Sequence, residues 1–252
     1  MIQGLYTAAD GMLAVEAKQS AISNNIANTS TPGYKRAEPI LSGFYTVFSD
    51  QLRQPFHFNI QTAPGGGVRL GETSSDQTPG ALTEVDNPLA MALQGPGYFV
   101  VDTPQGQRFT RSGNFTMNGQ GQLATMDGYT VEGVGGQPID VRGGKVEVGT
   151  DGSVRVGRVP AGQIRLLDFK STRGFRREGN NLFSAPAQEV ANATPPTNTY
   201  VQANALESSN VNLPREITEM MLGMRAYEAN QKVVQAIDAT MGRLIDQVGF
   251  PG

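Results

Sequence analysis

Apolar side chains recur at helical spacing at both ends of the chain, in steps that alternate between three and four residues. The N-terminal row consists of Leu5, Ala8, Met12, Val15, Ile22 and Ile26, with the polar Gln19 between Val15 and Ile22. The C-terminal row consists of Ile217, Met220, Met224, Tyr227, Val234, Ile237, Met241, Leu244 and Val248, with the polar Gln231 in the same series. Such rows are typical of helices that pack along a seam. They predict two terminal helices that pair as a coiled-coil-like stalk, with local overwinding where two steps of three meet at Val234.

The middle of the chain has the pattern of short β-strands. Apolar runs such as YFVV at residues 98–101 and IRLL at residues 164–167 are separated by pairs that favour hairpin turns, including Asn118-Gly119, Asp127-Gly128 and Asp151-Gly152. Residues 78–205 are therefore predicted to form an antiparallel all-β domain, which makes the fold class α+β. Residues 1–34 hold the N-terminal helix, 35–77 an extended linker with room for one hairpin, and 206–252 the C-terminal helix.

The start of the C-terminal helix carries local signals. Asn212 is suited to cap the helix, and Pro214 is tolerated in the first turn, where a backbone N–H is not needed. A helix of this length is marginal by itself, and two helices that pair only with each other each keep an open flank. Lateral contact with other copies would complete the burial, whereas a self-contained two-helix stalk is the simpler alternative.

The amino-acid composition argues against most kinds of catalytic and metal-binding sites. The chain has 252 residues, a net charge of −3, no cysteine and one histidine, His57. We therefore expect no catalytic residues, no metal site, no cofactor and no enzymatic activity. The net negative charge argues against a basic surface that would bind nucleic acid. No apolar run is long enough for membrane insertion. The N-terminus lacks the pattern of a cleaved signal peptide, so export, if it occurs, is expected to use another route.

Several local patterns have plainer explanations than a functional site. GQGQLA at residues 119–124 fits a dinucleotide fingerprint, but it lies between two strands rather than before a helix. The aspartates at 102, 127, 140, 151 and 168 could meet in a cleft, although Asp127 and Asp151 precede glycines and suit turns. The arginines at 173, 176 and 177 could bind an acidic partner, and a solvated loop is the simpler reading.

Ordered motifs along almost the whole chain resemble the flagellar basal-body rod and hook protein family. SNNIAN at residues 23–28 with TPGYK at 31–35 is similar to the family's N-terminal signature, and LESSNVN at 206–212 to its C-terminal one. The middle is similar as well, in the segments TPGAL (78–82), NPL (87–89), GYFVV (97–101) and FTRSGNF (109–115).

This resemblance implies a structural subunit of the periplasmic rod, exported by the flagellar type III apparatus. Its terminal helices would line the inner tube of an axial polymer made with other copies and other rod and hook proteins. No large outer insertion is present, which favours a rod subunit over a hook subunit. The short linker is similar to that of proximal rod proteins, whereas RAYEAN at 225–230 is more like the distal ones. The alternative is a secreted glycan-binding or glycan-cleaving β-domain that its helices oligomerise.

The Asn-rich motif predicts how the first helix ends. Asparagine is a weak helix former, and Pro32-Gly33 fits the central positions of a type II turn before Tyr34. Asn24 and Asn28 lie one helical turn apart, with Asn25 between them. Their carboxamides could cap the helix or reach a neighbouring subunit, and both readings remain open from the sequence.

Overall fold

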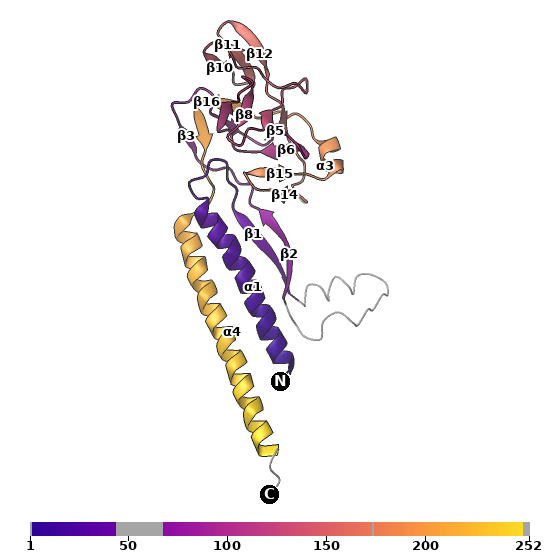
Figure 1. Ribbon diagram of the computed structural model, residues 1–252, viewed down its shortest axis with the longest axis vertical. Helices are drawn as coiled ribbons and strands as arrows, with labels where there is room; N and C mark the ends of the chain where they lie inside the picture. The colour runs from indigo at the N-terminus through magenta and orange to yellow at the C-terminus, as the bar shows by residue number, and fades with distance from the viewer. Residues whose placement is uncertain (1, 44–67, 173, 249–252) are drawn as a thin grey trace. The chain divides into compact units, whose positions relative to one another are not determined.

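The computed structural model describes residues 2–43, 68–172 and 174–248, which form an α+β protein (Figure 1). Contacts divide the chain into two units. The helical unit comprises residues 1–27, 37–76 and 212–252, and the β unit comprises residues 28–36 and 77–211. The predicted α+β class, with a helix at each end and an antiparallel β region between them, is thus confirmed, and the coiled-coil-like character of the helix pairing stays a prediction. Within the described residues, neither long helix carries a stretch apolar enough to cross a bilayer.

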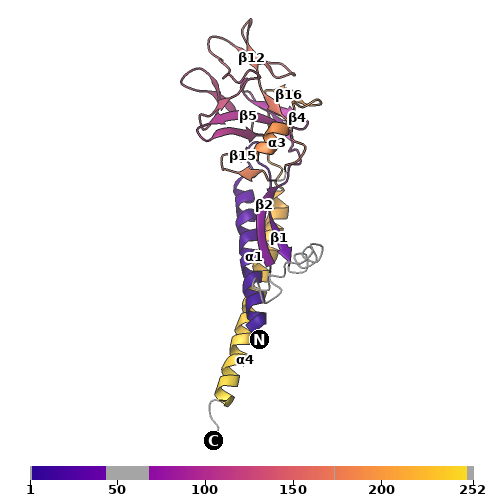
Figure 2. The same ribbon diagram turned by 90° about the vertical axis from the view of Figure 1, so that its right-hand side faces the viewer.

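The helical unit is built on two long helices that lie side by side in opposite directions (Figures 1 and 2). They are α1 (Ile2–Ala27) and α4 (Leu213–Val248). Asn212 caps α4 as predicted, because its Oδ1 accepts the Arg215 N–H at 3.1 Å.

Contacts between the helices fix an antiparallel register. A β-carbon added to Gly4 would lie 3.4 Å from Ile237, and one added to Gly11 would lie 3.0 Å from Asn230. Farther along, Asn25 contacts Glu216. Successive contact positions are seven and fourteen residues apart on both helices, and they run in opposite directions along the chain.

This register shifts the inner row of α4 by one residue from the predicted row in its first half. The less exposed positions there include Glu216, Gly223 and Asn230, whereas Ile217, Met224 and Gln231 are exposed. The inner row then continues through Val234 and Ile237 with steps of four and three. The local overwinding predicted at Val234 is therefore not needed. Periodicity favours the apolar neighbours, because it carries no information about contacts with the partner helix such as that between Gly11 and Asn230.

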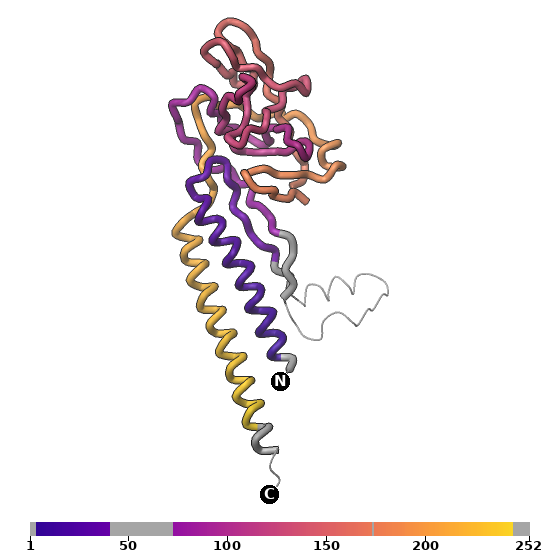
Figure 3. Tube along the Cα trace, in the orientation of Figure 1, coloured from indigo at the N-terminus to yellow at the C-terminus, as the bar shows by residue number. Residues whose placement is uncertain are grey.

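A hairpin packs on α1 within the same unit. β1 (Ala37–Gly43) pairs antiparallel with β2 (Val68–Ser75), with an irregularity between Pro39 and Leu41. The start of β1 and the end of β2 run alongside α1 in Figure 3, and both strands contact this helix. The linker predicted at 35–77 thus contains a pair of strands, and His57 lies outside the described residues.

The β unit is an assembly of short antiparallel strands with one small helix. Among the described residues its largest sheet has eight strands in the order β14-β15-β6-β5-β9-β8-β7, with β13 paired to β5. These strands are β5 (Tyr98–Thr103), β6 (Gly106–Thr110), β7 (Phe115–Met117), β8 (Leu123–Thr125), β9 (Thr130–Val131), β13 (Leu166–Leu167), β14 (Arg176–Arg177) and β15 (Leu182–Ser184). The small helix is α3 (Ala187–Asn192).

The described part of the β unit also contains three smaller sheets. They contain β10 (Val146–Val148), β11 (Ser153–Val156) and β12 (Val159–Gln163) in one sheet, β4 (Met91–Gln94) with β16 (Tyr200–Ala203) in another, and β3 (Leu82–Glu84) with β17 (Ala205–Glu207) in the third. The buried core centres on Phe99, Phe115, Leu123 and Val131. An aromatic cluster around Phe109 and Phe169 forms a second core.

Two boundaries differ from the sequence-based ones. Residues 206–212, which we assigned with the C-terminal helix, precede it, because strand β17 runs to Glu207 and the helix begins at Leu213. Residues 28–34, assigned with the N-terminal helix, belong to the β unit. Both segments carry polar groups that are satisfied by partners in the β unit, and a helical pattern does not report such partners.

Candidate functional site

The chain that follows α1 makes two successive turns. The Thr31 N–H donates to the Asn28 carbonyl at 3.1 Å, and the Tyr34 N–H donates to the Thr31 carbonyl at 3.2 Å. Gly33 has φ +70°, and Pro32 can adopt only negative φ. This combination is that of a type II turn with Pro32 and Gly33 at its centre. We call residues 31–36 the turn anchor.

Gly33 lies against backbone of another segment. A β-carbon at this position would be 2.5 Å from both the N and Cα atoms of Ser112. The Gly33 N–H also donates to the Glu207 carbonyl at 2.6 Å. Glycine is therefore required twice here, once for its φ and once for the space.

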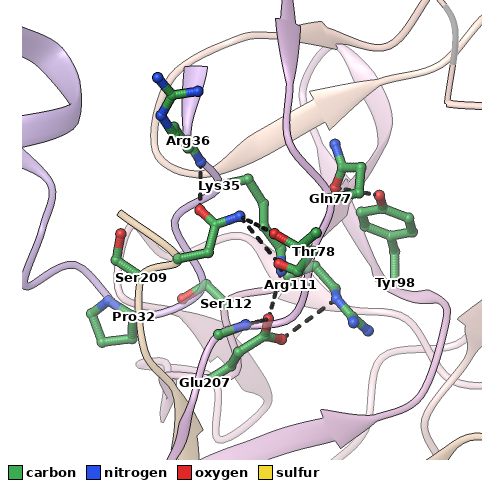
Figure 4. Close-up of polar contacts among 12 residues, drawn as sticks. Pro32, Lys35, Arg36, Gln77, Thr78, Tyr98, Arg111, Ser112, Glu207 and Ser209 are labelled. Atoms are coloured by element: carbon green, nitrogen blue, oxygen red, sulfur yellow. Dashed lines mark hydrogen bonds and ion pairs between the residues drawn. The ribbon is translucent and has the colours of Figure 1, made fainter. Parts of the chain in front are cut away.

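A buried ion pair holds the next part of the turn anchor (Figure 4). Lys35 Nζ lies 2.6 Å from Glu207 Oε1, and each side chain is 1% exposed. Lys35 also donates to the Thr78 carbonyl at 2.8 Å, and the Gly80 N–H donates to Glu207 Oε1 at 3.0 Å. Removing one partner of such a pair typically costs about 3–5 kcal/mol, because the other charge stays buried.

Arg111 extends this cluster. Its Nε lies 3.5 Å from Glu207 Oε2, an ion contact too long for a good hydrogen bond. Its Nη1 and Nη2 donate to the carbonyls of Gly97 and Gly95 at 2.8 and 2.9 Å. The guanidinium thereby ties the turn leading into β5 to the carboxylate that pairs with Lys35.

Asn210 joins the turn anchor to the segment that leaves the β unit. Its Oδ1 accepts the Arg36 N–H at 2.7 Å, and its Nδ2 donates to the carbonyl and hydroxyl of Thr78, both at 3.1 Å. The Asn210 N–H approaches the Tyr34 carbonyl at 3.4 Å. Segments 31–36, 78–80 and 207–210 are thus fixed to one another.

The predicted arginine cluster is only partly a solvated loop. Arg176 is exposed, whereas the Arg177 guanidinium lies 4.3 Å from the centre of the Tyr34 ring. Arg177 Nη2 donates to the Lys35 carbonyl, and Asn181 donates to the Pro32 carbonyl at 3.1 Å. Arg177 therefore supports the turn anchor by a cation–π contact and a hydrogen bond. Arg173 lies outside the described residues.

The Asn-rich motif divides between the two units. Asn24 is exposed, and Asn25 is fully buried in the helical unit. Asn28 belongs to the β unit, and its Oδ1 accepts the Thr31 hydroxyl at 3.2 Å.

The predicted assembly seams are buried to different degrees. On α1, Ala8 and Ile22 are buried, Met12, Val15 and Ile26 are half-buried, and Leu5 is exposed. On α4, Met220, Val234, Ile237 and Met241 are half-buried, and Ile217, Met224 and Tyr227 are exposed. The side chains of Leu244 and Val248 lie outside the described set. Part of each seam therefore faces the partner helix, and part remains at the surface.

Several titratable groups have pKa values that their surroundings shift. Hydrogen bonds from Arg142 lower the pKa of Asp140 to about 2, and hydrogen bonds from Ser153 lower the pKa of Asp151 below its usual range. Burial raises the pKa of the Tyr98 hydroxyl, which donates to Gln77 at 2.7 Å. Across the described ranges, the carboxylates and other potential ligands form no group of three that could hold a metal ion.

Lys35 and Glu207 both lie in motifs that carry the family resemblance, but the sequence does not predict that they pair. A separation of 172 residues leaves no periodic signal. The charged residues inside otherwise small, polar motifs, Lys35 in TPGYK and Glu207 in LESSN, are the clue that was available. Arg111 in FTRSGNF gives the same clue.

Three family models match the chain in order. The flagella basal body rod protein model matches residues 5–35, the flagellar hook protein FlgE/F/G D1 domain model matches residues 92–156, and the flagellar basal body rod FlgEFG protein C-terminal model matches residues 202–247. The first model includes residues 31–35 of the turn anchor, and the third includes Glu207. The second includes Arg111.

Curated relatives resemble the chain over nearly its whole length. The flagellar basal-body rod protein FlgG of Caulobacter vibrioides is 35% identical, over 94% of this chain and 96% of its own length. The flagellar basal-body rod protein FlgF of Mesorhizobium japonicum is 30% identical over 99% of both chains. The flagellar hook-basal body complex protein FlhO of Bacillus subtilis is 29% identical, again over 99% of both.

Proposed function

This chain belongs to the flagellar basal-body rod protein family, and we propose that it self-assembles with other axial proteins into the torque-transmitting shaft. The family consists of structural proteins of the flagellum basal body, and the chain is accordingly a rod structural subunit. The mode of assembly, the periplasmic position and delivery by the flagellar type III export apparatus are parts of the proposal.

The observation that carries the proposal is the apolar surface that α4 leaves open. Ile217, Met221 and Met224 are each between 46% and 54% exposed, and Leu213 precedes them by one turn. Positions 213, 217, 221 and 224 recur at steps of four and three, so they share one face of the helix. An apolar stripe of this length on a helix that already has one partner supports lateral packing against further helices.

Burial by other copies would account for the apolar stripe on α4. Within the described part of α4, Glu216 is the one fully buried residue, so the pairing with α1 leaves much of the helix accessible. Helices in such a position gain most of their stability from tertiary contacts. Other copies of this chain carry the same surface and could cover it.

The turn anchor supports a second requirement of a shaft. Torque has to pass through each subunit without loosening it, and the buried Lys35–Glu207 pair with Arg111 resists rearrangement of segments 31–36 and 207–210. A fully desolvated ion cluster of this kind fixes one arrangement.

Within the rod we propose the proximal position, on the basis of the short linker. Relatives named FlgF and FlgG resemble the chain to a similar degree, so the distal position and a hook-like position are the alternatives. Labelling the protein in purified basal bodies and locating the label along the rod would decide among them.

The test of the proposed function is a deletion strain complemented with this chain. We expect the protein to co-purify with detergent-extracted basal bodies and to restore complete rods, and we expect no turnover or specific binding of peptidoglycan by the purified chain. A soluble protein absent from basal bodies, with measurable peptidoglycan binding or cleavage, would favour the glycan-acting alternative.

A further inference from the structure

The buried Asn25 side chain connects three elements of the helical unit. Asn25 lies in the last turn of α1, Ala37 begins β1, and Glu216 lies in the first turn of α4. Asn25 Oδ1 accepts the Ala37 N–H at 2.8 Å, and Asn25 Nδ2 donates to the Ala37 carbonyl at 2.9 Å. The same Nδ2 donates to Glu216 Oε2 at 3.1 Å. Asn25 and Glu216 are both fully buried.

The two bonds to Ala37 resemble those of a neighbouring strand. A carboxamide carries one acceptor oxygen and a donor NH2, which is the pair of functions that a peptide group offers. Ala37 is aligned with Ser75 of β2. Asn25 thus satisfies both backbone polar groups of the first residue of β1, which would otherwise be costly to bury.

Glu216 sets the orientation of this carboxamide. Rotating the Asn25 amide by half a turn would place its oxygen against the Ala37 carbonyl and the Glu216 carboxylate. Glu216 itself belongs near the positive end of α4, which favours a carboxylate there. The orientation that Ala37 needs is therefore reinforced by a group that arrives only when α4 packs against α1.

We propose that Asn25 and Glu216 form a clamp that makes the order of the β1–β2 hairpin depend on the pairing of α1 with α4. With α4 in place, Glu216 holds the Asn25 amide toward Ala37, and the start of the hairpin is fixed. With the helices apart, the carboxylate returns to water and the hairpin loses a buried attachment. Asn25 is a positioning residue in this scheme. Its consequence for rod building rests on the proposed function, but the clamp itself does not.

Amide hydrogen exchange of the purified full-length chain, followed by mass spectrometry, tests the clamp. Asn25→Asp keeps the size of the side chain but replaces the donor with an oxygen that faces Glu216 and the Ala37 carbonyl. We expect exchange in β1 and β2 to accelerate about tenfold, with β5 in the β unit unchanged. The matched control is Asn24→Asp, at the exposed neighbouring position, which we expect to exchange like the wild type.

A double variant separates positioning from simple loss of packing. Adding Glu216→Gln to Asn25→Asp removes one of two facing carboxylates and supplies a donor, so part of the hairpin protection should return. If Asn25→Asp also accelerates exchange in β5, the variant is unfolding globally, and the single variant Glu216→Gln then provides the test. For Glu216→Gln we expect exchange in the hairpin to rise about twofold to fivefold, with exchange in β5 unchanged. An Asn25→Asp hairpin that exchanges like that of Asn24→Asp would overturn the clamp. The clamp would also be overturned if the double variant recovered no hairpin protection, or if the hairpin of Glu216→Gln exchanged like that of the wild type. A wild-type hairpin without protection from exchange would overturn it as well. None of these results depends on whether the chain builds rods.

Discussion

Gly33 shows how one residue can be fixed by two independent constraints. Its φ of +70° is unfavourable for residues with a β-carbon, and its α-carbon faces the backbone of Ser112. Pro32 beside it contributes in a different way, by restricting the unfolded chain. The sequence identified the turn from the Pro-Gly pair, but the close approach to Ser112 comes from a segment some eighty residues away and leaves no trace in the turn itself.

We therefore expect Gly33→Ala to destabilise the β unit far more than Pro32→Ala. The alanine has to accept a left-handed conformation and displace backbone at Ser112, which should cost about 2–4 kcal/mol. Pro32→Ala should cost less than about 1 kcal/mol. Denaturant unfolding of the purified variants measures both. Equal midpoints for the two would show that the turn relaxes around a side chain.

At the scale of elements, α4 has two faces with different tasks. The face toward α1 combines small and polar residues such as Gly223 and Asn230 with Val234 and Ile237. The neighbouring face carries Ile217 and Met224 at the surface. Periodicity located the helix, its cap and its amphipathic character, because these depend on local spacing. The choice between adjacent rows depends on the partner helix, where Gly11 lies against Asn230.

Met224→Asp should block assembly while leaving the single chain folded. The Met224 side chain is 51% exposed, so a carboxylate there stays hydrated in the isolated protein. In a packed shaft it would be buried without a partner, at a cost of several kcal/mol per subunit. We expect complementation of a deletion strain to fail, with few complete rods in extracted basal bodies.

Met224→Leu is the matched control, since it keeps an apolar side chain of similar volume. We expect the strain that carries Met224→Leu to swim normally. Ile26→Asp should also prevent assembly, but Ile26 is half-buried in the single chain, so a folding defect would contribute. Normal motility of the Met224→Asp strain would remove this face of α4 from the proposed assembly surface.

The molecule as a whole consists of two units of unequal internal burial. The β unit has two apolar cores and a buried ion cluster, which sequence reasoning located only in part. Alternating strands and turn pairs marked the region, whereas the ion cluster joins residues too distant for any pattern. Among the helix residues whose burial the structure describes, few are buried: Ala8, Ala14, Ile22 and Asn25 on α1 and Glu216 on α4. The helical unit should therefore open more readily than the β unit.

Limited proteolysis of the isolated chain should reveal this difference. We expect cleavage in α4 and α1 first, and a resistant product that covers most of residues 77–211. A peptide containing residues 28–36 should remain bound to that product after cleavage, because Lys35 and Gly33 attach it to Glu207. Mass spectrometry of the digest identifies both. Long helices that survive as well as β5 in a verified monomer would contradict the expected order of opening.

The interleaving of the two units along the chain also sets a sequence in time. The β unit takes its residues from two stretches and is complete in sequence once Val211 is present, whereas the helical unit needs three stretches, the last of which starts at Asn212. A chain that becomes available for folding from its N-terminus can thus finish the β unit while α1 still waits for α4. The surface proposed for assembly then takes shape last, on a unit whose partner is already folded.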